Sequence, residues 1–350
     1  MKRIVMLEPV GSACNLRCVY CYQDPIRVPK NVMSEPILEK SISDALELGD
    51  KIRFLWHGGE PLLAGREFFQ KAYDLQEFYK KPDQLIENHI QTNATLVNKE
   101  WARFLAKYGF KVGTSLDGPE HLHNLTRDRS YQKVIRGIKN IQATSNTVGV
   151  VITISTFNVD YPDEIWEKLI LPKDLATAWE INICTSTETS SFTPSEEKSI
   201  WFLCRLFDLW LENDNPEIYI KTFRVVLRAL MGANPGDCAF ECNKCNLFLA
   251  IDELGDVYTC NRFLKREVAH LGNIKTQKLQ DILNSEKAKT LYWKISGLKP
   301  ECKNCKWLLA CGGGCAFQRW MSTGRFDAGF PECEIRKALF SHIENKIKNG

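Results

Sequence analysis

The 350-residue sequence lacks any run of about 20 apolar residues, the length that a membrane-spanning helix needs. Its first apolar stretch, inside MKRIVMLEPVG, is too short for the core of a secretory signal peptide. A net charge of +3 is too small to indicate nucleic acid or an anionic membrane as the main partner. Tandem repeats and low-complexity segments are also absent. We therefore expect a cytoplasmic globular protein that binds neither nucleic acid nor membrane.

Cysteine is the residue that the sequence has in excess, with 14 in the chain. In a reducing cytoplasm, clustered cysteines indicate metal or iron–sulfur sites rather than disulfides. Three of them lie at residues 14–21 and nine lie from Cys238 to Cys333, whereas Cys184 and Cys204 stand alone. We expect these last two to pack as small apolar side chains.

The first half of the chain alternates short apolar runs with amphipathic segments. The runs are rich in Val, Ile and aromatic residues, as strands buried on both faces should be, and predict strands at 4–10, 52–57, 86–93, 112–116, 148–155 and 179–186. The other segments predict helices at 34–48, 66–81, 99–109, 131–142, 196–213 and 217–232. A complete eight-unit barrel takes about 250 residues. Six units in a shorter stretch predict an α/β fold built on a parallel, incomplete (β/α)6 barrel.

The character of the sequence changes after NPGD, at residues 234–237, to loops, cysteines and short strands. We place the barrel with its two linking helices at 1–232 and a cysteine-rich domain at 233–335. A terminal helix is expected at 336–350.

The segment CNLRCVYCY holds Cys14, Cys18 and Cys21 on the loop after the first predicted strand. In barrel folds, that end of a strand carries the chemistry. Structural zinc sites take four ligands, usually in CxxC pairs. Three close thiolates suit instead a 4Fe–4S cluster whose fourth iron is open to a small molecule.

This C-x3-C-x-aromatic-C motif resembles that of the radical S-adenosylmethionine (SAM) enzymes. GGEP at 58–61, QTN at 91–93 and SLDG at 115–118 follow in that family's order. The double glycine and Asp117-Gly118 would each alone pass for a turn, and Arg127 for a surface charge, yet together the motifs end successive predicted strands. The resemblance implies SAM on the open iron, its cleavage to a 5′-deoxyadenosyl radical, and hydrogen abstraction from a substrate. The SAM contacts that it implies are Tyr20, Gly58, Gly59, Glu60, Asn93, Ser115 and Arg127.

The later cysteines are similar to the SPASM extension, which holds two auxiliary 4Fe–4S clusters in enzymes that modify ribosomal peptides and proteins. Two zinc ribbons are the alternative, because CxxC with two further cysteines is also zinc spacing. The resemblance implies one cluster on Cys302, Cys305, Cys311 and Cys333. It implies another on Cys245, Cys260 and Cys315, completed by Cys238, which we favour, or by Cys242. Clusters closed by four thiolates suit electron transfer.

The SPASM resemblance implies a peptide or protein substrate and an electron donor such as flavodoxin or ferredoxin. Anaerobic sulfatase maturases share this layout and convert Cys or Ser to formylglycine, with an aspartate as general base directly after the cysteine of G-x4-C. Here that residue is Asn261, and a neutral amide cannot accept a proton as a carboxylate does. We therefore expect a maturase that forms a carbon–carbon (cyclophane) or thioether cross-link within a ribosomally made peptide.

Three other functions remain open at this point. They are formylglycine formation, dehydrogenation of a small molecule, and a non-enzymatic iron–sulfur or zinc protein. The general base is unassigned, with Asp117 and His57 as candidates. Only 13 residues precede Cys14, so we expect no winged precursor-binding domain before the barrel.

Overall fold

Six parallel strands form the first part of the fold. The structure, a computed structural model, describes residues 2–23, 31–185, 192–297 and 299–349. The strands are β1 (Lys2–Leu7), β2 (Lys51–Trp56), β3 (Leu85–Gln91), β4 (Lys111–Ser115), β5 (Val148–Ile154) and β6 (Ala178–Ile183). Each pairs in parallel with the next, which confirms the predicted α/β barrel of six units. The predicted ends of the sixth strand and of the terminal helix, residues 186 and 350, lie outside the described residues.

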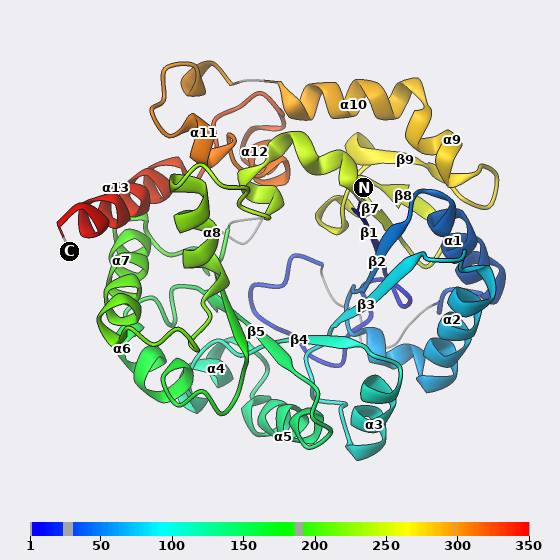
Figure 1. Cartoon of the computed structure of the whole chain (residues 1–350), viewed down its shortest axis with the longest axis horizontal. Helices are drawn as coiled ribbons and strands as arrows, with labels where there is room; N and C mark the ends of the chain where they lie inside the picture. Colours follow the sequence, from blue (N-terminus) through cyan, green and yellow to red (C-terminus); the bar gives the residue numbers. More distant parts are fainter. Residues whose placement is uncertain (1, 24–30, 186–191, 298, 350) are drawn as a thin grey trace.

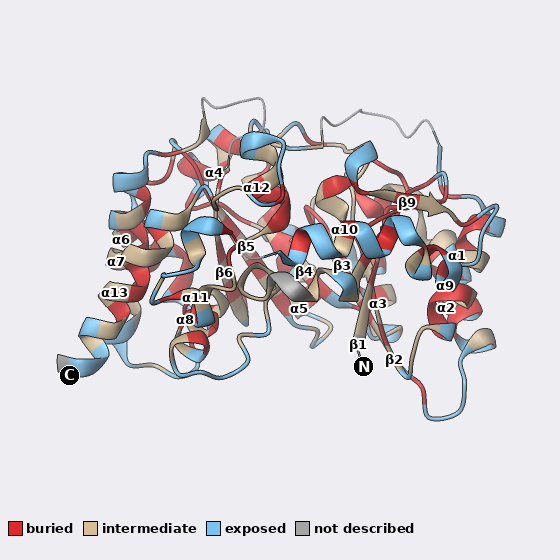
Figure 2. Cartoon of the chain, turned by 90° about the horizontal axis from the view of Figure 1, so that it is seen from above, coloured by how far each residue is buried: buried red, intermediate tan, exposed pale blue. Residues whose placement is uncertain are grey.

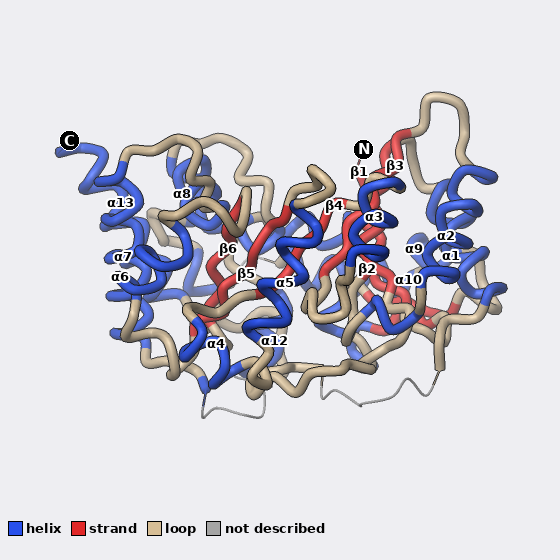
Figure 3. The backbone as a smooth tube through the Cα atoms, turned by 90° about the horizontal axis from the view of Figure 1, so that it is seen from below, coloured by secondary structure: helices blue, strands red, loops and turns tan. Residues whose placement is uncertain are grey.

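Helices follow the outer side of this arc of strands (Figures 1 and 3). They are α1 (Glu35–Glu47), α2 (Arg66–Tyr79), α3 (Lys99–Lys107), α4 (Glu120–Thr126), α5 (Tyr131–Gln142), α6 (Pro162–Ile165), α7 (Glu196–Asn213) and α8 (Lys221–Leu230). All six predicted helices are present, with ends within about one turn of those expected. Among the described residues, no helix combines the length and the apolar character that crossing a bilayer requires.

Burial alternates along the strands, so that only one face of each is sealed. In β2, Phe54 and Trp56 are fully buried, whereas the residues between the buried ones are partly exposed. The Trp56 ring packs edge-on against Phe69 of α2, with centroids 5.3 Å apart, so the sealed face is the helix-covered one (Figure 2). The expectation that both faces are buried was wrong. The six strands do not close, and their inner face carries polar pairs such as Arg53 Nε with Glu87 Oε2 at 2.8 Å.

The cysteine-rich part of the chain extends the same sheet. Strand β7 (Phe248–Ile251) pairs with β1 in parallel, and β8 (Asp256–Tyr258) and β9 (His270–Asn273) continue it antiparallel. The described sheet therefore has nine strands in the order β6-β5-β4-β3-β2-β1-β7-β8-β9. Because β7 lies beside β1, the end of β1 and the cysteine-rich segment are neighbours. The predicted domain boundaries at 232/233 and 335/336 stay predictions.

The remaining helices cover the cysteine-rich part and return to the barrel. They are α9 (Leu279–Asn284), α10 (Glu286–Ser296), α11 (Leu308–Cys311), α12 (Ala316–Thr323) and α13 (Cys333–Asn349). Helix α13 packs beside α7 (Figure 1), where His342 Nε2 lies 2.7 Å from Asp208 Oδ1. This contact attaches α13 to α7, one of the helices that cover the barrel.

Candidate active site

The loop after β1 carries the first three cysteines at the carboxyl end of the strand, and all three are partly exposed. Burial raises the pKa of the Cys14 thiol to about 11, and the nearby Glu60 carboxyl and the thiols of Cys18 and Cys21 add to the rise. The Asn93 amide donates from Nδ2 to Cys14 Sγ at 3.7 Å. Thiolates gathered in this way need a compensating cation, which the iron of a cluster would supply.

The double glycine at the end of β2 packs directly against the cysteine loop. Gly58 has a φ of +108°, and a Cβ on Gly59 would lie 2.1 Å from the carbonyl oxygen of Ala13. The Gly59 N–H donates to Gly11 O at 2.8 Å, and the Glu60 N–H donates to Ala13 O at 2.7 Å. No side chain fits at residue 59 unless the loop moves. The glycine pair therefore fixes the position of the loop, and its contact with SAM stays a prediction.

Glu60 is fully buried, and its carboxylate binds groups of the chain itself. It accepts hydrogen bonds from the Leu62 N–H at 3.0 Å, the Thr92 hydroxyl at 2.8 Å and the Asn93 N–H at 2.7 Å. Burial raises the pKa of Glu60 to about 7, although these bonds act to lower it. The carboxylate thus joins the end of β2 to the end of β3 and holds Asn93 beside Cys14. Its direct contact with SAM stays a prediction.

Tyr20, the aromatic residue of the cysteine motif, ties the loop to the end of β4. Its hydroxyl donates to the Asp117 carboxylate and accepts from Arg127 Nη1 at 2.8 Å. Asp117 is fully buried and also accepts from the Thr126 hydroxyl at 2.9 Å and the Thr153 N–H at 3.1 Å. The Asp117 carboxylate thus accepts from three donors, and Nη1 of Arg127 lies 3.9 Å from its Oδ1. These contacts stabilise the carboxylate and disfavour Asp117 as a base. Buried Nε of Arg127 has no partner among the described residues, which fits the SAM carboxylate that the resemblance assigns to it.

Asn261, from the cysteine-rich part, lies against the end of β2. Its Nδ2 donates to the Tyr22 hydroxyl at 3.1 Å and lies 3.5 Å from Nδ1 of His57. By the resemblance, Asn261 occupies the position of the general-base aspartate of the sulfatase maturases. The fold places it beside His57, one of the two predicted base candidates. Sequence reasoning missed Tyr22, although its place directly after the cysteine motif was an available signal.

His57 is held as a neutral imidazole. Burial, and secondly the nearby Arg262 guanidinium, lower the pKa of His57 to about 4. Its Nδ1 accepts the Gly58 N–H at 2.7 Å, which leaves the imidazole proton on Nε2. His57 therefore presents a donor rather than an open acceptor, and its role as general base stays a prediction.

Four thiols of the cysteine-rich part lie close enough to interact: two precede β7, one follows β8 and one directly precedes α12. Burial raises the pKa of Cys238 well above its usual range, and so do its neighbours, which include the thiols of Cys315, Cys245 and Cys260. Burial likewise raises the pKa of Cys260 to about 12, with Cys315 adding to the rise. This grouping supports Cys238 as the fourth ligand beside Cys245, Cys260 and Cys315. The side chain of Cys242 lies outside the part that the structure describes.

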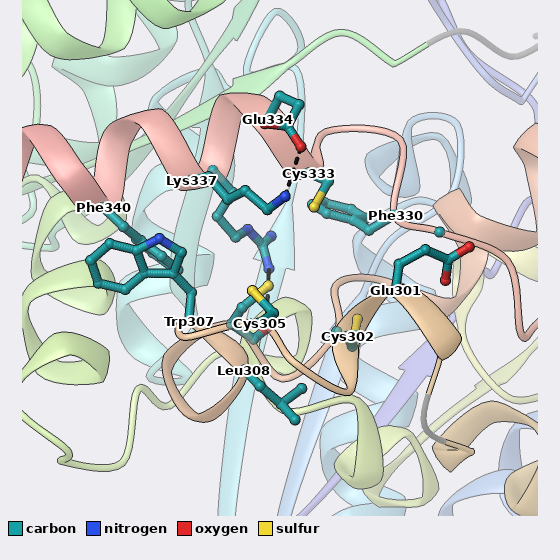
Figure 4. A pocket seen from close by; sticks show the side chains of 14 residues that line it. Glu301, Cys302, Cys305, Trp307, Leu308, Phe330, Cys333, Glu334, Lys337 and Phe340 are labelled. Atoms are coloured by element: carbon teal, nitrogen blue, oxygen red, sulfur yellow. Dashed lines mark hydrogen bonds and ion pairs between the residues drawn. The ribbon is translucent and has the colours of Figure 1, made fainter.

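The other four cysteines line a cavity of about 310 Å³. The thiols of Cys302, Cys305 and Cys333 surround its centre (Figure 4), and Cys311 also lines it. Burial raises the pKa of Cys302, and the thiols of Cys311, Cys333 and Cys305 add to the rise. A cavity walled by four cysteines fits a closed iron–sulfur cluster.

The remaining predicted residues are placed as follows. Ser115 ends β4, and its hydroxyl accepts a hydrogen bond from Gln91 Nε2 at 3.4 Å, at the same end of the sheet as the cysteine loop. Cys184 is buried and Cys204 is partly buried, in keeping with packing roles. The donor sets therefore fit one cluster on three thiols and two clusters on four thiols each, as ligand assignments that stay predictions.

Comparisons with known proteins identify the families that the chain resembles. Residues 9–169 match the model of the radical SAM superfamily, and residues 238–306 match that of SPASM, an iron–sulfur cluster-binding domain. A serine-type anaerobic sulfatase-maturating enzyme of Bacteroides thetaiotaomicron is 31% identical over 97% of this chain and 89% of its own length. A cysteine-type enzyme of Clostridium perfringens is 28% identical over 89% of this chain and 88% of its own.

Solved structures show the same relationship. The structure of native anSMEcpe with bound AdoMet has a TM-score of 0.87 and 26% identity, covering 99% of this chain and 98% of that one. Streptococcus suis SuiB bound to S-adenosylmethionine has a TM-score of 0.71 at 16% identity, over 95% of this chain and 77% of that one, which shows a common fold. The cofactors are therefore SAM and 4Fe–4S clusters. The chain belongs to the radical SAM superfamily, as a SPASM-domain enzyme related to the anaerobic sulfatase-maturating enzymes.

Proposed function

We propose that this enzyme oxidises a cysteine or serine side chain of a protein substrate to formylglycine, as the resemblance to sulfatase maturases implies. The observation that carries the proposal is the 31% identity to a serine-type sulfatase-maturating enzyme over 97% of this chain. A further structure of anSMEcpe, with AdoMet and the Cp18Cys peptide, has a TM-score of 0.87 to this chain at 25% identity. That complex supports a polypeptide as the substrate here.

The predicted peptide cross-link has less support. The similarity to SuiB, which was solved with its precursor peptide, rests on 15% identity and reflects the fold alone. What favours cross-linking as a second candidate is one residue, Asn261, which replaces the carboxylate expected in a sulfatase maturase. The two candidates therefore differ in what happens to the substrate after hydrogen abstraction.

The oxidation removes one hydrogen atom, one electron and one proton from the side chain of the substrate. Serine then gives the aldehyde directly, whereas cysteine gives a thioaldehyde that water hydrolyses to the aldehyde with release of hydrogen sulfide. SAM and the clusters, once bound and reduced by a donor such as flavodoxin or ferredoxin, would supply the abstracting radical and an electron acceptor. The residues of the chain have to hold the substrate near the cysteine loop and give the proton a way out. The Tyr22–Asn261–His57 contact lies between that loop and the cysteine-rich part, at the position where the resemblance puts the base of a sulfatase maturase, which supports it as the candidate exit for the proton.

Peptides from a sulfatase that differ only in Cys or Ser at the target position test the proposal. The reconstituted enzyme, SAM and reductant should convert both, with loss of two hydrogens from the serine peptide, to a product that reacts with a hydrazide probe. A cross-linked peptide also loses two hydrogens but gives no aldehyde adduct. That second result would refute formylglycine formation and favour the cross-link. The Cys14→Ala variant, which lacks a ligand of the SAM-binding cluster, is the control for background oxidation.

The Asn261→Asp variant tests the proton step separately. It restores a carboxylate beside Tyr22 and His57, and general-base catalysis contributes about 10²–10⁴-fold to such steps. We expect aldehyde formation to become up to about 10²-fold faster if proton removal limits the rate. A slower variant that still cleaves SAM would show that the amide itself is required, and would count against a proton acceptor at this position.

A further inference from the structure

Arg336 lies at the wall of the cavity that is lined by Cys302, Cys305, Cys311 and Cys333, the site of the predicted outer cluster. Helix α13 begins at Cys333, and Arg336 follows it by three residues, so both lie on the same side of the first turn. Both residues line the cavity, together with Cys311. Neither the SAM motif nor the SPASM cysteines point to this arginine.

Two aromatic rings hold the guanidinium group of Arg336. Its central carbon is 4.1 Å from the centroid of the Phe240 ring and 4.4 Å from that of Phe330. A planar cation held between two rings is fixed in orientation, and lysine cannot reproduce this geometry.

The glycines between Cys311 and Cys315 make room for these rings. Gly312 has a φ of +63°, and a Cβ on it would lie 2.2 Å from the Phe240 carbonyl oxygen. A Cβ on Gly314, whose φ is +75°, would lie 2.3 Å from the Phe330 ring. The backbone between Cys311 and Cys315 therefore leaves room for the aromatic rings that pack against Arg336.

The clamped guanidinium group donates hydrogen bonds to both cysteine-bearing segments. Nη1 of Arg336 lies 2.9 Å from Ala239 O, 3.3 Å from Cys311 O and 3.5 Å from Cys311 Sγ. Ala239 is the residue after Cys238, a predicted ligand of the inner cluster, which is the one assigned to Cys238, Cys245, Cys260 and Cys315. One side chain thus connects the ligand segments of the two auxiliary clusters and reaches a ligand sulfur directly.

We propose that Arg336 raises the reduction potential of the cluster held by Cys302, Cys305, Cys311 and Cys333. Hydrogen bonds to ligand sulfurs and nearby positive charge stabilise the reduced cluster, which is the more negative state. Of the other charged groups at the cavity, Lys337 also acts electrostatically on the thiols of Cys333 and Cys305, but its ammonium group donates to Glu334 at 2.8 Å, whereas Arg336 donates to a ligand sulfur. Cys260, in the inner group, precedes the Asn261 that contacts Tyr22, so the inner cluster lies nearer the cysteine loop. A higher potential at the outer cluster would draw the electron away from the active site.

An EPR-monitored redox titration of the reconstituted enzyme without substrate tests this role. SAM addition identifies the signal of the first cluster, because only that cluster binds SAM. In Arg336→Gln, the midpoint of one auxiliary signal should fall by at least about 59 mV, a tenfold change in the ratio of reduced to oxidised cluster. The matched control is Lys337→Gln, which removes the same charge one residue away and should shift the midpoint less.

Equal midpoints in Arg336→Gln and Lys337→Gln, at unchanged iron content, would overturn the proposal. If Arg336→Gln fails to retain the cluster, Arg336→Lys replaces it in the titration. The lysine keeps a charge but loses the planar group that packs on Phe240 and Phe330 and so positions Nη1 beside Ala239 O and Cys311 Sγ, and its midpoint should also fall. An unchanged midpoint in Arg336→Lys, with cluster loss in Arg336→Gln, would leave Arg336 a purely structural role and refute the tuning. Because no substrate is present, the result is independent of formylglycine formation.

Discussion

Replacing Gly59 with alanine should displace the cysteine loop. The added Cβ would lie 2.1 Å from Ala13 O and 2.7 Å from Ser12 C, and these are backbone atoms that cannot rotate away. Overpacking costs about 1–3 kcal/mol. The hydrogen bonds Gly59 N–H to Gly11 O and Glu60 N–H to Ala13 O add about 1 kcal/mol each if the loop moves away. The unfolded chain of an alanine variant is less flexible, which returns about 0.4–1 kcal/mol. The net loss of stability is then about 2–5 kcal/mol.

Gly149→Ala is the matched control for this variant. Gly149 lies in β5, and a Cβ there meets nothing closer than 4.0 Å. The control should be unchanged or more stable by about 0.4–1 kcal/mol. Urea denaturation of the two variants, with SAM binding measured by equilibrium dialysis on the reconstituted proteins, gives the comparison. If Gly59→Ala matched Gly149→Ala in both stability and SAM affinity, the glycine pair would not fix the cysteine loop and the reasoning would fail.

Three further variants test other parts of the site. In His57→Gln, the pH dependence of thermal stability should change, because the pKa of the wild-type imidazole falls from 6.5 to about 4 on folding. Between these two pH values the unfolded wild type binds a proton that the folded protein does not, so the stability of wild type relative to the variant should decrease as the pH drops. A constant difference in stability across this window would contradict the prediction. In Cys311→Ala, iron should fall from about 12 to about 8 per chain, as expected for three four-iron clusters. SAM cleavage should persist, and its loss would mean that this cysteine serves the first cluster. In Tyr20→Phe, loss of the hydroxyl that joins Asp117 and Arg127 should destabilise the protein by about 1.5–3 kcal/mol in urea denaturation, and an unchanged midpoint would show that the link is unimportant.

The strands and the cysteine groups could be predicted because they are encoded locally. Apolar runs placed β2 and β5 within one residue of their observed ends, and the helix over 196–213 was predicted in full. The contacts that decide the chemistry connect distant segments and leave no local pattern. Asn261 meets His57 across 204 residues, and Arg336 meets Ala239 across 97. The pairing of β7 with β1 brings the segment of Asn261 beside the barrel, and it joins two strands that lie far apart in the sequence.

The position of Asn261 bears on how such enzymes diverge. The barrel supplies the cysteine loop, the glycine pair and Glu60, which depend on close backbone packing and tolerate little change. Asn261 instead belongs to the cysteine-rich part and meets the barrel side chains of Tyr22 and His57. Exchanging a carboxylate for an amide there should alter proton removal and leave the cysteine loop in place. We therefore expect separate segments to control hydrogen abstraction and the later fate of the substrate. If Asn261→Asp were to abolish SAM cleavage rather than change the product, that separation would be disproved.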